Sequence, residues 1–210
     1  MFKDRIDAGQ KLADVLQEYK NKEHTIIMAL PRGGVVPGYI IAKELILPLG
    51  VIMVKKIGHP FNPEYAIGAV SLNGIVLDEQ SDISKEYIEG STLRLRALLK
   101  DRYKMYYGNK PPPKLKDQCV IVVDDGIATG KTLLAAIELI RKEDPKEIIV
   151  AVPVGPNSTI RKLKMIVDQL ICLESYDDFH AIGLYYEDFD QVSDKEVKTF
   201  LNNAEEIVSS

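Results

Sequence analysis

VIVVDDGIATGKT, residues 120–132, is the most informative segment of this chain. Its apolar half is typical of a strand covered on both faces, and the apolar residues after it begin a helix. The small residues between them therefore lie at a helix N-terminus, where free N–H groups and the positive end of the helix dipole favour an anion. Asp124 and Asp125 precede the loop. The stretch therefore predicts a phosphate site, and carboxylates beside it suit either sugar hydroxyls or a bound divalent cation.

Two other interpretations of the same stretch have to be considered, and its spacing decides the first of them. A P-loop phosphotransferase is written G-x-x-x-x-G-K-[ST] and requires glycine five residues before Gly130, where this chain has Asp125. That mismatch excludes the P-loop class. A plain strand, turn and helix without a ligand is the remaining alternative.

The composition indicates an ordinary globular domain. The chain has 210 residues, a net charge of −4, 28% charged and 46% hydrophobic residues. Without a basic excess we expect no nucleic-acid partner. The longest apolar stretch, residues 45–54, contains Pro48 and Gly50 and falls short of the roughly 20 residues that span a bilayer. We therefore expect no membrane partner and a cytoplasmic protein. The two cysteines and three histidines show no zinc-site spacing.

Apolar runs alternate with helical patterns along most of the chain. We predict buried strands at 25–30, 51–54, 119–123, 147–154 and 169–173, and helices in 6–19, 39–45, 84–106, 132–142 and 157–167. A short hairpin is expected at 66–70 and 74–77. The alternation predicts one α/β domain over residues 1–210, built on an open, mainly parallel sheet with helices on both faces. Ligands of such sheets bind at the carboxyl ends of the strands, so the loops after Leu30, Val54, Val123 and Val154 should converge.

The stretch at 120–132 resembles the signature of the type I phosphoribosyltransferases, in which an apolar strand and two acids precede a small residue, Thr-Gly and Thr. The resemblance implies the fold of that family and binding of phosphoribosyl pyrophosphate (PRPP). It places Asp124 and Asp125 at the ribose hydroxyls as catalytic residues. The residues that it implies for the 5-phosphate follow the acids: Gly126, Ile127, Ala128, Thr129, Gly130, Lys131 and Thr132.

Two further segments resemble family features. Arg32 and Gly33, after the first strand, match the Arg/Lys-Gly of the loop that holds pyrophosphate. Lys55 and Lys56 match a segment found after the second strand, which implies that one of them reaches pyrophosphate. The alternatives are a simple turn with a solvated arginine, and solvated lysines at a strand end.

The family covers its site with a small variable hood that recognises the base. We expect hood elements from the N-terminal helix and from about 174–210. Phe179, Tyr185 and Tyr186 are the candidates for base recognition, because aromatic faces stack on planar bases. Aromatic residues that form the core of the hood are the alternative.

The resemblance implies an enzyme of nucleotide salvage or synthesis. It would transfer a 5-phosphoribosyl group from PRPP to an unidentified nitrogenous base, with Mg²⁺ as cofactor and Asp124 and Asp125 as its ligands, directly or through ribose or water. The chain looks most like a group of predicted phosphoribosyltransferases of unassigned acceptor, and the family makes a homodimer the expected assembly. Ala128 stands where 6-oxopurine enzymes usually carry Asp, which argues against hypoxanthine and guanine. A regulatory module that binds PRPP or a nucleotide without turnover is the alternative function.

Overall fold

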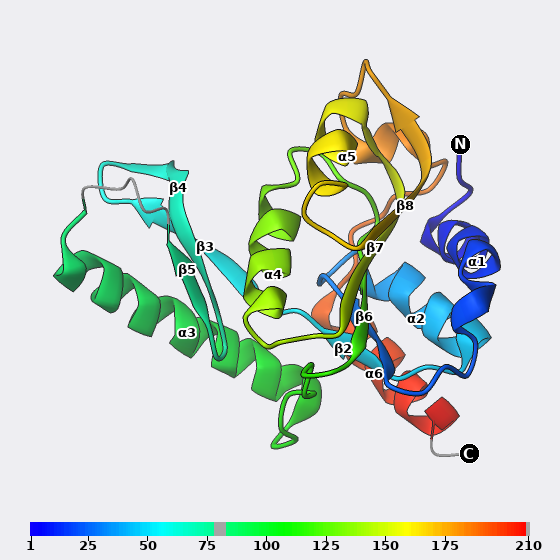
Figure 1. Ribbon diagram of the computed structural model, residues 1–210, viewed down its shortest axis with the longest axis horizontal. Coiled ribbons are helices and arrows are strands. Elements are labelled where there is room, and N and C mark those ends of the chain that lie inside the picture. Colours follow the sequence, from blue (N-terminus) through cyan, green and yellow to red (C-terminus); the bar gives the residue numbers. More distant parts are fainter. Residues whose placement is uncertain (78–82, 209–210) are drawn as a thin grey trace.

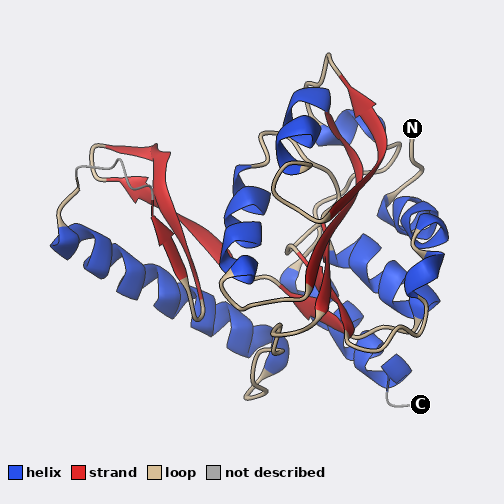
Figure 2. Ribbon diagram, viewed as in Figure 1, coloured by secondary structure: helices blue, strands red, loops and turns tan. Residues whose placement is uncertain are grey.

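A central parallel sheet carries the fold of the computed structural model, which describes residues 1–77 and 83–208. Its strand order is β2-β1-β6-β7-β8, and every neighbouring pair is parallel (Figures 1 and 2). The strands are β1 (Thr25–Ala29), β2 (Leu49–Val51), β6 (Cys119–Val123), β7 (Glu147–Pro156) and β8 (Gln169–Tyr176). All residues of β1 and β6 are buried, which explains their unbroken apolar sequences.

Helices cover both faces of this sheet, as the alternation predicts (Figure 1). On one face, α1 (Arg5–Val15) and α2 (Val35–Leu45) pack with Ile27 and Ile121 of the strands. On the other, α4 (Lys131–Arg141) and α5 (Asn157–Leu163) pack with Val120 and Val122. Successive residues of one strand thus serve two different cores. The prediction of an α/β fold with helices on both faces is confirmed.

A second, antiparallel sheet projects from the core beside a long helix. Its strands are β3 (Val54–His59), β4 (Asn62–Ser71) and β5 (Ile75–Leu77), in the order β3-β4-β5. Together with α3 (Lys85–Tyr107) they form what we call the arm (Figure 1). Inside it, Ile57, Ile67 and Val70 pack against Leu99 and Tyr103.

The arm confirms one expectation and corrects another. The predicted hairpin is present as β4 and β5. The predicted strand at 51–54, however, ends in the central sheet at Val51, and Val54–His59, expected as a loop, is strand β3. The physical reason is the pairing of β3 with β4, which continues from Val54↔Ser71 to His59↔Asn62. Hydrogen bonds to a partner strand decide such a segment, and its own hydrophobic pattern does not reveal them.

The two ends of the chain are built into the fold in different places. Phe2 forms a parallel bridge with Tyr186, just after the short 3₁₀ helix η2 (Ile182–Tyr185). A second 3₁₀ turn, η1 (Gln17–Tyr19), follows α1. The last helix, α6 (Asp194–Val208), instead packs on α2 and α3. No helix within residues 1–77 and 83–208 is long and apolar enough to cross a membrane.

Candidate functional site: the carboxyl ends of β1 and β6

The loop of residues 126–130 joins β6 to the N-terminus of α4, as the sequence predicts. Gly130 has φ +72° and precedes the first helical residue, Lys131. A Cβ on Gly130 would also lie 2.6 Å from Cγ2 of Thr159, whose hydroxyl donates to the Ala128 carbonyl at 3.1 Å. Thr159 of helix α5 therefore supports the loop through this contact and this hydrogen bond. Ala128 and Thr129 are exposed, so the loop and the first turn of α4 are open to an anion.

The two acids at the end of β6 have different surroundings. Oδ1 of Asp124 accepts the N–H of Asp125 at 2.9 Å. Burial, and then the carboxylate of Asp125, raise the pKa of Asp124 well above its ordinary value. Asp125 is only 8% exposed, and its Oδ2 accepts from Nε of Arg5 at 2.7 Å. The guanidinium compensates one carboxylate, and the other is left with the raised pKa.

The first loop touches this acid pair directly. A Cβ on Gly33 would lie 1.9 Å from Oδ2 of Asp125, and one on Gly34 would lie 2.8 Å from Cα of Asp124. The preceding peptide bond, between Pro31 and Arg32, is cis. Strands β1 and β6 are neighbours and end in register, with Ala29 opposite Val123. The predicted convergence of the loops after these two strands is confirmed, and glycine is what allows the contact.

A pocket of about 460 Å³ opens beside the contact of the two loops. Ile182, one of the residues that line the pocket, packs closely on Gly126 of the loop after β6. A Cβ on Gly126 would lie 2.6 Å from Cγ2 of Ile182. The residues that line the pocket come from four segments of the chain: Arg5, Arg32, Gly33, Asp125, Ile182, Phe189, Gln191 and Val192.

Arg5 is the charged residue of the pocket that sequence reasoning missed. It pairs with Asp125, 120 residues further along, and both side chains are about one-tenth exposed, at 11% and 12%. Its guanidinium also lies 3.7 Å from the centroid of the Phe189 ring. In the sequence, Arg5 is one of several charges at the start of an amphipathic helix, and no local signal separates it from them.

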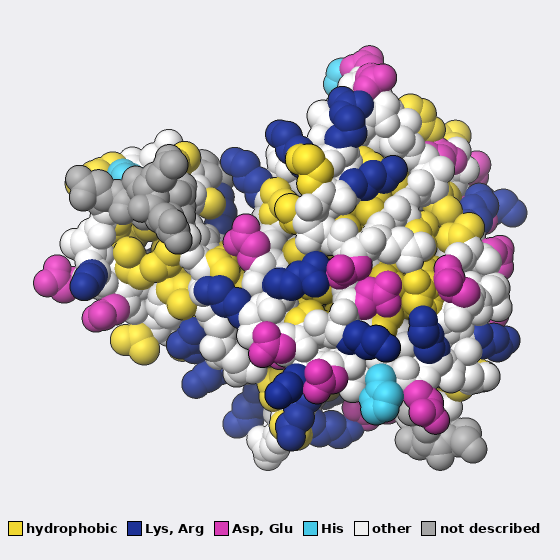
Figure 3. All heavy atoms as spheres, in the orientation of Figure 1, with side chains coloured by type: hydrophobic (Ala, Val, Ile, Leu, Met, Phe, Trp, Pro, Cys, Tyr) yellow, Lys and Arg dark blue, Asp and Glu magenta, His cyan; other side chains and the backbone are white. Residues whose placement is uncertain are grey.

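Lys55 and Lys56 lie on strand β3 of the arm, and not in the pocket of Arg32. They line a larger cleft of about 1230 Å³ between the arm and α4, together with Thr129, Lys131 and Thr132. Lys and Arg side chains border the hollow between arm and core in Figure 3. The structure thus brings the two lysines into one cleft with three of the predicted phosphate-binding residues.

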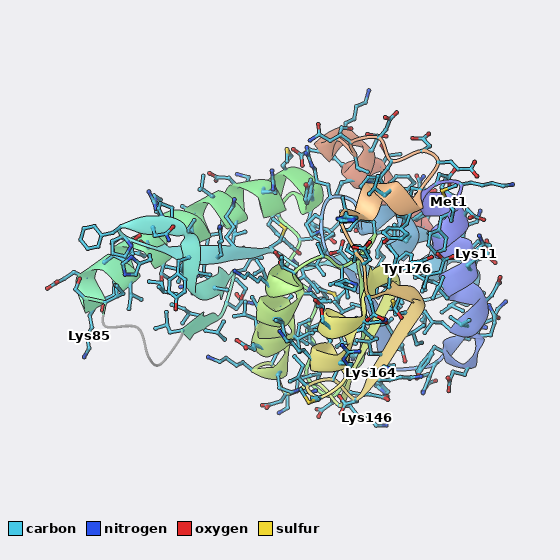
Figure 4. All side chains as sticks on the ribbon, turned by 90° about the horizontal axis from the view of Figure 1, so that it is seen from above. Met1, Lys11, Lys85, Lys146, Lys164 and Tyr176 are labelled. Carbon is cyan, nitrogen blue, oxygen red and sulfur yellow. The ribbon has the colours of Figure 1, made fainter. Side chains whose placement is uncertain are left out.

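The three predicted base-recognition residues pack chiefly on other aromatic rings. Tyr186 is 5% exposed, lies between Phe2 and Phe189, and donates its hydroxyl to the Asp125 carbonyl at 2.7 Å. Tyr185 stacks on Phe179 at 4.9 Å and also on Tyr176. Tyr176 and Met1, both labelled in Figure 4, bind the carboxylate of Glu174, which ties this aromatic cluster to the N-terminus. None of the three lines the pocket, so their role in base recognition stays a prediction.

The acid pair suits a cation that is shared with a substrate. In the described part of the chain, no group of three or more His, Cys, Asp or Glu side chains is arranged to hold a metal ion by itself. Mg²⁺ usually keeps several waters and is held by one or two carboxylates together with substrate phosphates. The carboxylates of Asp124 and Asp125 are oxygen donors of this kind, and they lie beside the loop expected to take the phosphate.

Comparison with known proteins identifies the same family as the sequence at residues 120–132. The model of the "Phosphoribosyl transferase domain" family matches residues 3–190. Two Mycobacterium tuberculosis proteins, from strains CDC 1551 and H37Rv and both named "Putative phosphoribosyl transferase", are 34% identical over 214 residues. The match covers 97% of this chain but 47% of theirs, so the chain spans about half the length of the curated relatives it matches.

Solved structures of two other proteins have the same fold. The crystal structure of TT1426 from Thermus thermophilus superposes with a TM-score of 0.87 and 36% identity, covering 96% of this chain and 98% of that one. A protein of Aquifex aeolicus, AQ2163, shares the fold at a TM-score of 0.51 and 13% identity, over 94% of this chain and 85% of its own. With its signature loop at a helix N-terminus and a family match over most of its length, the chain belongs to the phosphoribosyl transferase domain family.

Proposed function

We propose that this chain transfers a 5-phosphoribosyl group from PRPP to a nitrogenous base in nucleotide salvage or synthesis. The observation that carries the proposal is the contact between two loops, in which Gly33 lies against the carboxylate of Asp125. One loop offers a helix N-terminus for the 5-phosphate, and the other offers the guanidinium of Arg32 for pyrophosphate. A donor with a phosphate at each end can bridge them.

The reaction forms a bond from the base nitrogen to C1 of the ribose and breaks the bond from C1 to the pyrophosphate oxygen. Asp124 and Asp125 would hold the ribose hydroxyls and offset the positive charge that develops on the sugar. These carboxylates would also hold Mg²⁺, directly or through ribose or water, and the ion would neutralise charge at the leaving pyrophosphate. Arg32 and the amide of Gly33 would hold that group in line, and Lys55 or Lys56 would approach it from the arm.

To test the proposal, the protein is incubated with PRPP, Mg²⁺ and each of a panel of bases, and the release of pyrophosphate is measured. Base-dependent release supports transfer and identifies the acceptor. Replacing both acids, Asp124→Asn with Asp125→Asn, should abolish release while far-UV circular dichroism stays unchanged. Asp101→Asn, an exposed acid on α3, is the matched control and should retain full activity.

Two other results would overturn the proposal. Tight PRPP binding without release across a broad panel would establish the regulatory module instead. Absence of PRPP binding by calorimetry would remove both phosphoribosyl transfer and a regulatory module that binds PRPP.

A further inference from the structure

The pocket beside the acid pair is the place where the structure carries the proposed function further. It adjoins Asp125, where the ribose would lie, and Arg32 and Gly33, where pyrophosphate would lie. The group that attacks C1 must stand next to the ribose, on the side of C1 opposite the leaving pyrophosphate. Within the pocket of about 460 Å³, the part lined by Arg5, Ile182 and Phe189 is therefore the space open to the acceptor.

Arg5 is held in this pocket by contacts on three sides. Nε donates to Asp125 at 2.7 Å, Nη1 donates to the Asp190 carbonyl at 2.8 Å, and Cζ lies 3.7 Å from the centroid of the Phe189 ring. A guanidinium has five N–H donors in a fixed plane and no acceptor. Within residues 1–77 and 83–208, its Nη2 makes no hydrogen bond. Arg5 thus brings spare donors to the pocket without the entropy cost of a loose side chain.

The rest of the lining limits what can meet these donors. Ile182, Phe189 and Val192 are apolar and suit the faces of a flat ring. The lining contains one carboxylate, that of Asp125, whose Oδ2 is taken by Arg5 and whose remaining oxygen faces a ribose in the proposed reaction. An exocyclic amino group that faced Arg5 would point its N–H donors at the N–H donors of the guanidinium, so no hydrogen bond could form between them. A carbonyl or carboxylate oxygen in the same place would accept a charge-assisted hydrogen bond.

We propose that this pocket receives the acceptor, and that Arg5 selects acceptors with an oxygen substituent over the matching amino compounds. The two oxygen groups that fulfil this requirement are a ring carbonyl and a carboxylate. The inference rests on the proposed function, since it requires PRPP as donor.

Two matched pairs of acceptors test the selection at saturating PRPP and Mg²⁺. Uracil and cytosine differ by a carbonyl in place of an amino group, and nicotinate and nicotinamide differ by a carboxylate in place of an amide. We expect the oxygen member of at least one pair to be favoured roughly tenfold or more in kcat/KM. Preference within the first pair alone identifies a carbonyl, and within the second alone a carboxylate.

Substitution of Arg5 shows whether this residue makes the selection. Arg5→Lys keeps a positive charge beside Asp125 but replaces the planar guanidinium, with its additional N–H donors, by a single ammonium group. The ratio of kcat/KM values within the favoured pair should therefore fall toward one. The ratio reports selection even where total activity changes. Lys11→Gln removes an exposed cation from the same helix and should leave the ratio unchanged (Figure 4).

Each contrary result has a distinct meaning. PRPP that fails to bind the unaltered protein would refute the proposed function itself. Three results obtained with PRPP bound would overturn the inference alone. They are equal use of both members of each pair, preference for cytosine or nicotinamide, and no pyrophosphate release with any of the four compounds. An unchanged ratio in folded Arg5→Lys would also overturn it. If that variant does not fold, the two pairs tested on the unaltered protein still decide the selection.

Discussion

Replacing Gly33 by alanine tests the contact on which the site depends. The added Cβ would lie 1.9 Å from Oδ2 and 2.6 Å from Cγ of Asp125, whereas real Cβ atoms keep at least 3.0 Å. The carboxylate or the loop must therefore move by about 1.1 Å, the difference between 1.9 and 3.0 Å. A shift of this size breaks the 2.7 Å bond to Arg5 and leaves two buried charges without their partner.

We expect Gly33→Ala to lower the free energy of unfolding by about 2–4 kcal/mol, the range for a broken buried ion pair that can partly relax. The chain has no tryptophan, so urea denaturation is best followed by far-UV circular dichroism. Gly90→Ala is the matched control. Its Cβ would meet nothing within 4 Å in the interior of α3, so this variant should gain up to about 1 kcal/mol from helix propensity.

A double-mutant cycle separates the clash from other effects of alanine. In an Asp125→Ala background the obstructing carboxylate is gone, so the additional cost of Gly33→Ala should fall below about 1 kcal/mol. Equal cost of Gly33→Ala in both backgrounds, or wild-type stability of the single variant, would refute the reasoning.

Three further variants test the surroundings of the site and of the sheet. Tyr186→Phe loses the buried hydrogen bond to the Asp125 carbonyl and should cost about 1–2 kcal/mol in urea denaturation, with no change in fold. Gly130→Ala combines φ +72° with a 2.6 Å approach to Thr159, and should weaken PRPP binding at least about tenfold by calorimetry while also lowering stability by about 1–3 kcal/mol. The pKa of Asp168 is lowered by a β7 backbone N–H and by an arginine of α4, so its charge stabilises the fold above its ordinary pKa and the benefit is lost as the pH falls through the lower folded value. Asp168→Asn should therefore be less stable than the unaltered chain by at most about 1 kcal/mol at pH 7, and the difference should shrink toward pH 3 in the same assay.

Local sequence patterns were enough to predict the central sheet and the position of the phosphate loop. Apolar runs such as Cys119–Val123 are local signals for strands buried on both faces, and Gly130 marks the start of the next helix. Since neighbouring parallel strands end at one edge of a sheet, the meeting of the Arg32 loop with Asp124 and Asp125 also followed from the order of the elements. These features depend on interactions close along the chain or on a general rule of topology.

The residues that complete the site are brought together by contacts between distant parts of the chain, which the sequence does not reveal. The segment at Lys55 is a strand because β4 pairs with it, and Arg5 reaches Asp125 because the N-terminus pairs with the segment at Tyr186. Such contacts leave no periodicity in the sequence, and a buried arginine there looks the same as a solvated one. The contact that places Arg5 in the pocket joins residues 120 positions apart, so its energy comes from the folded chain as a whole.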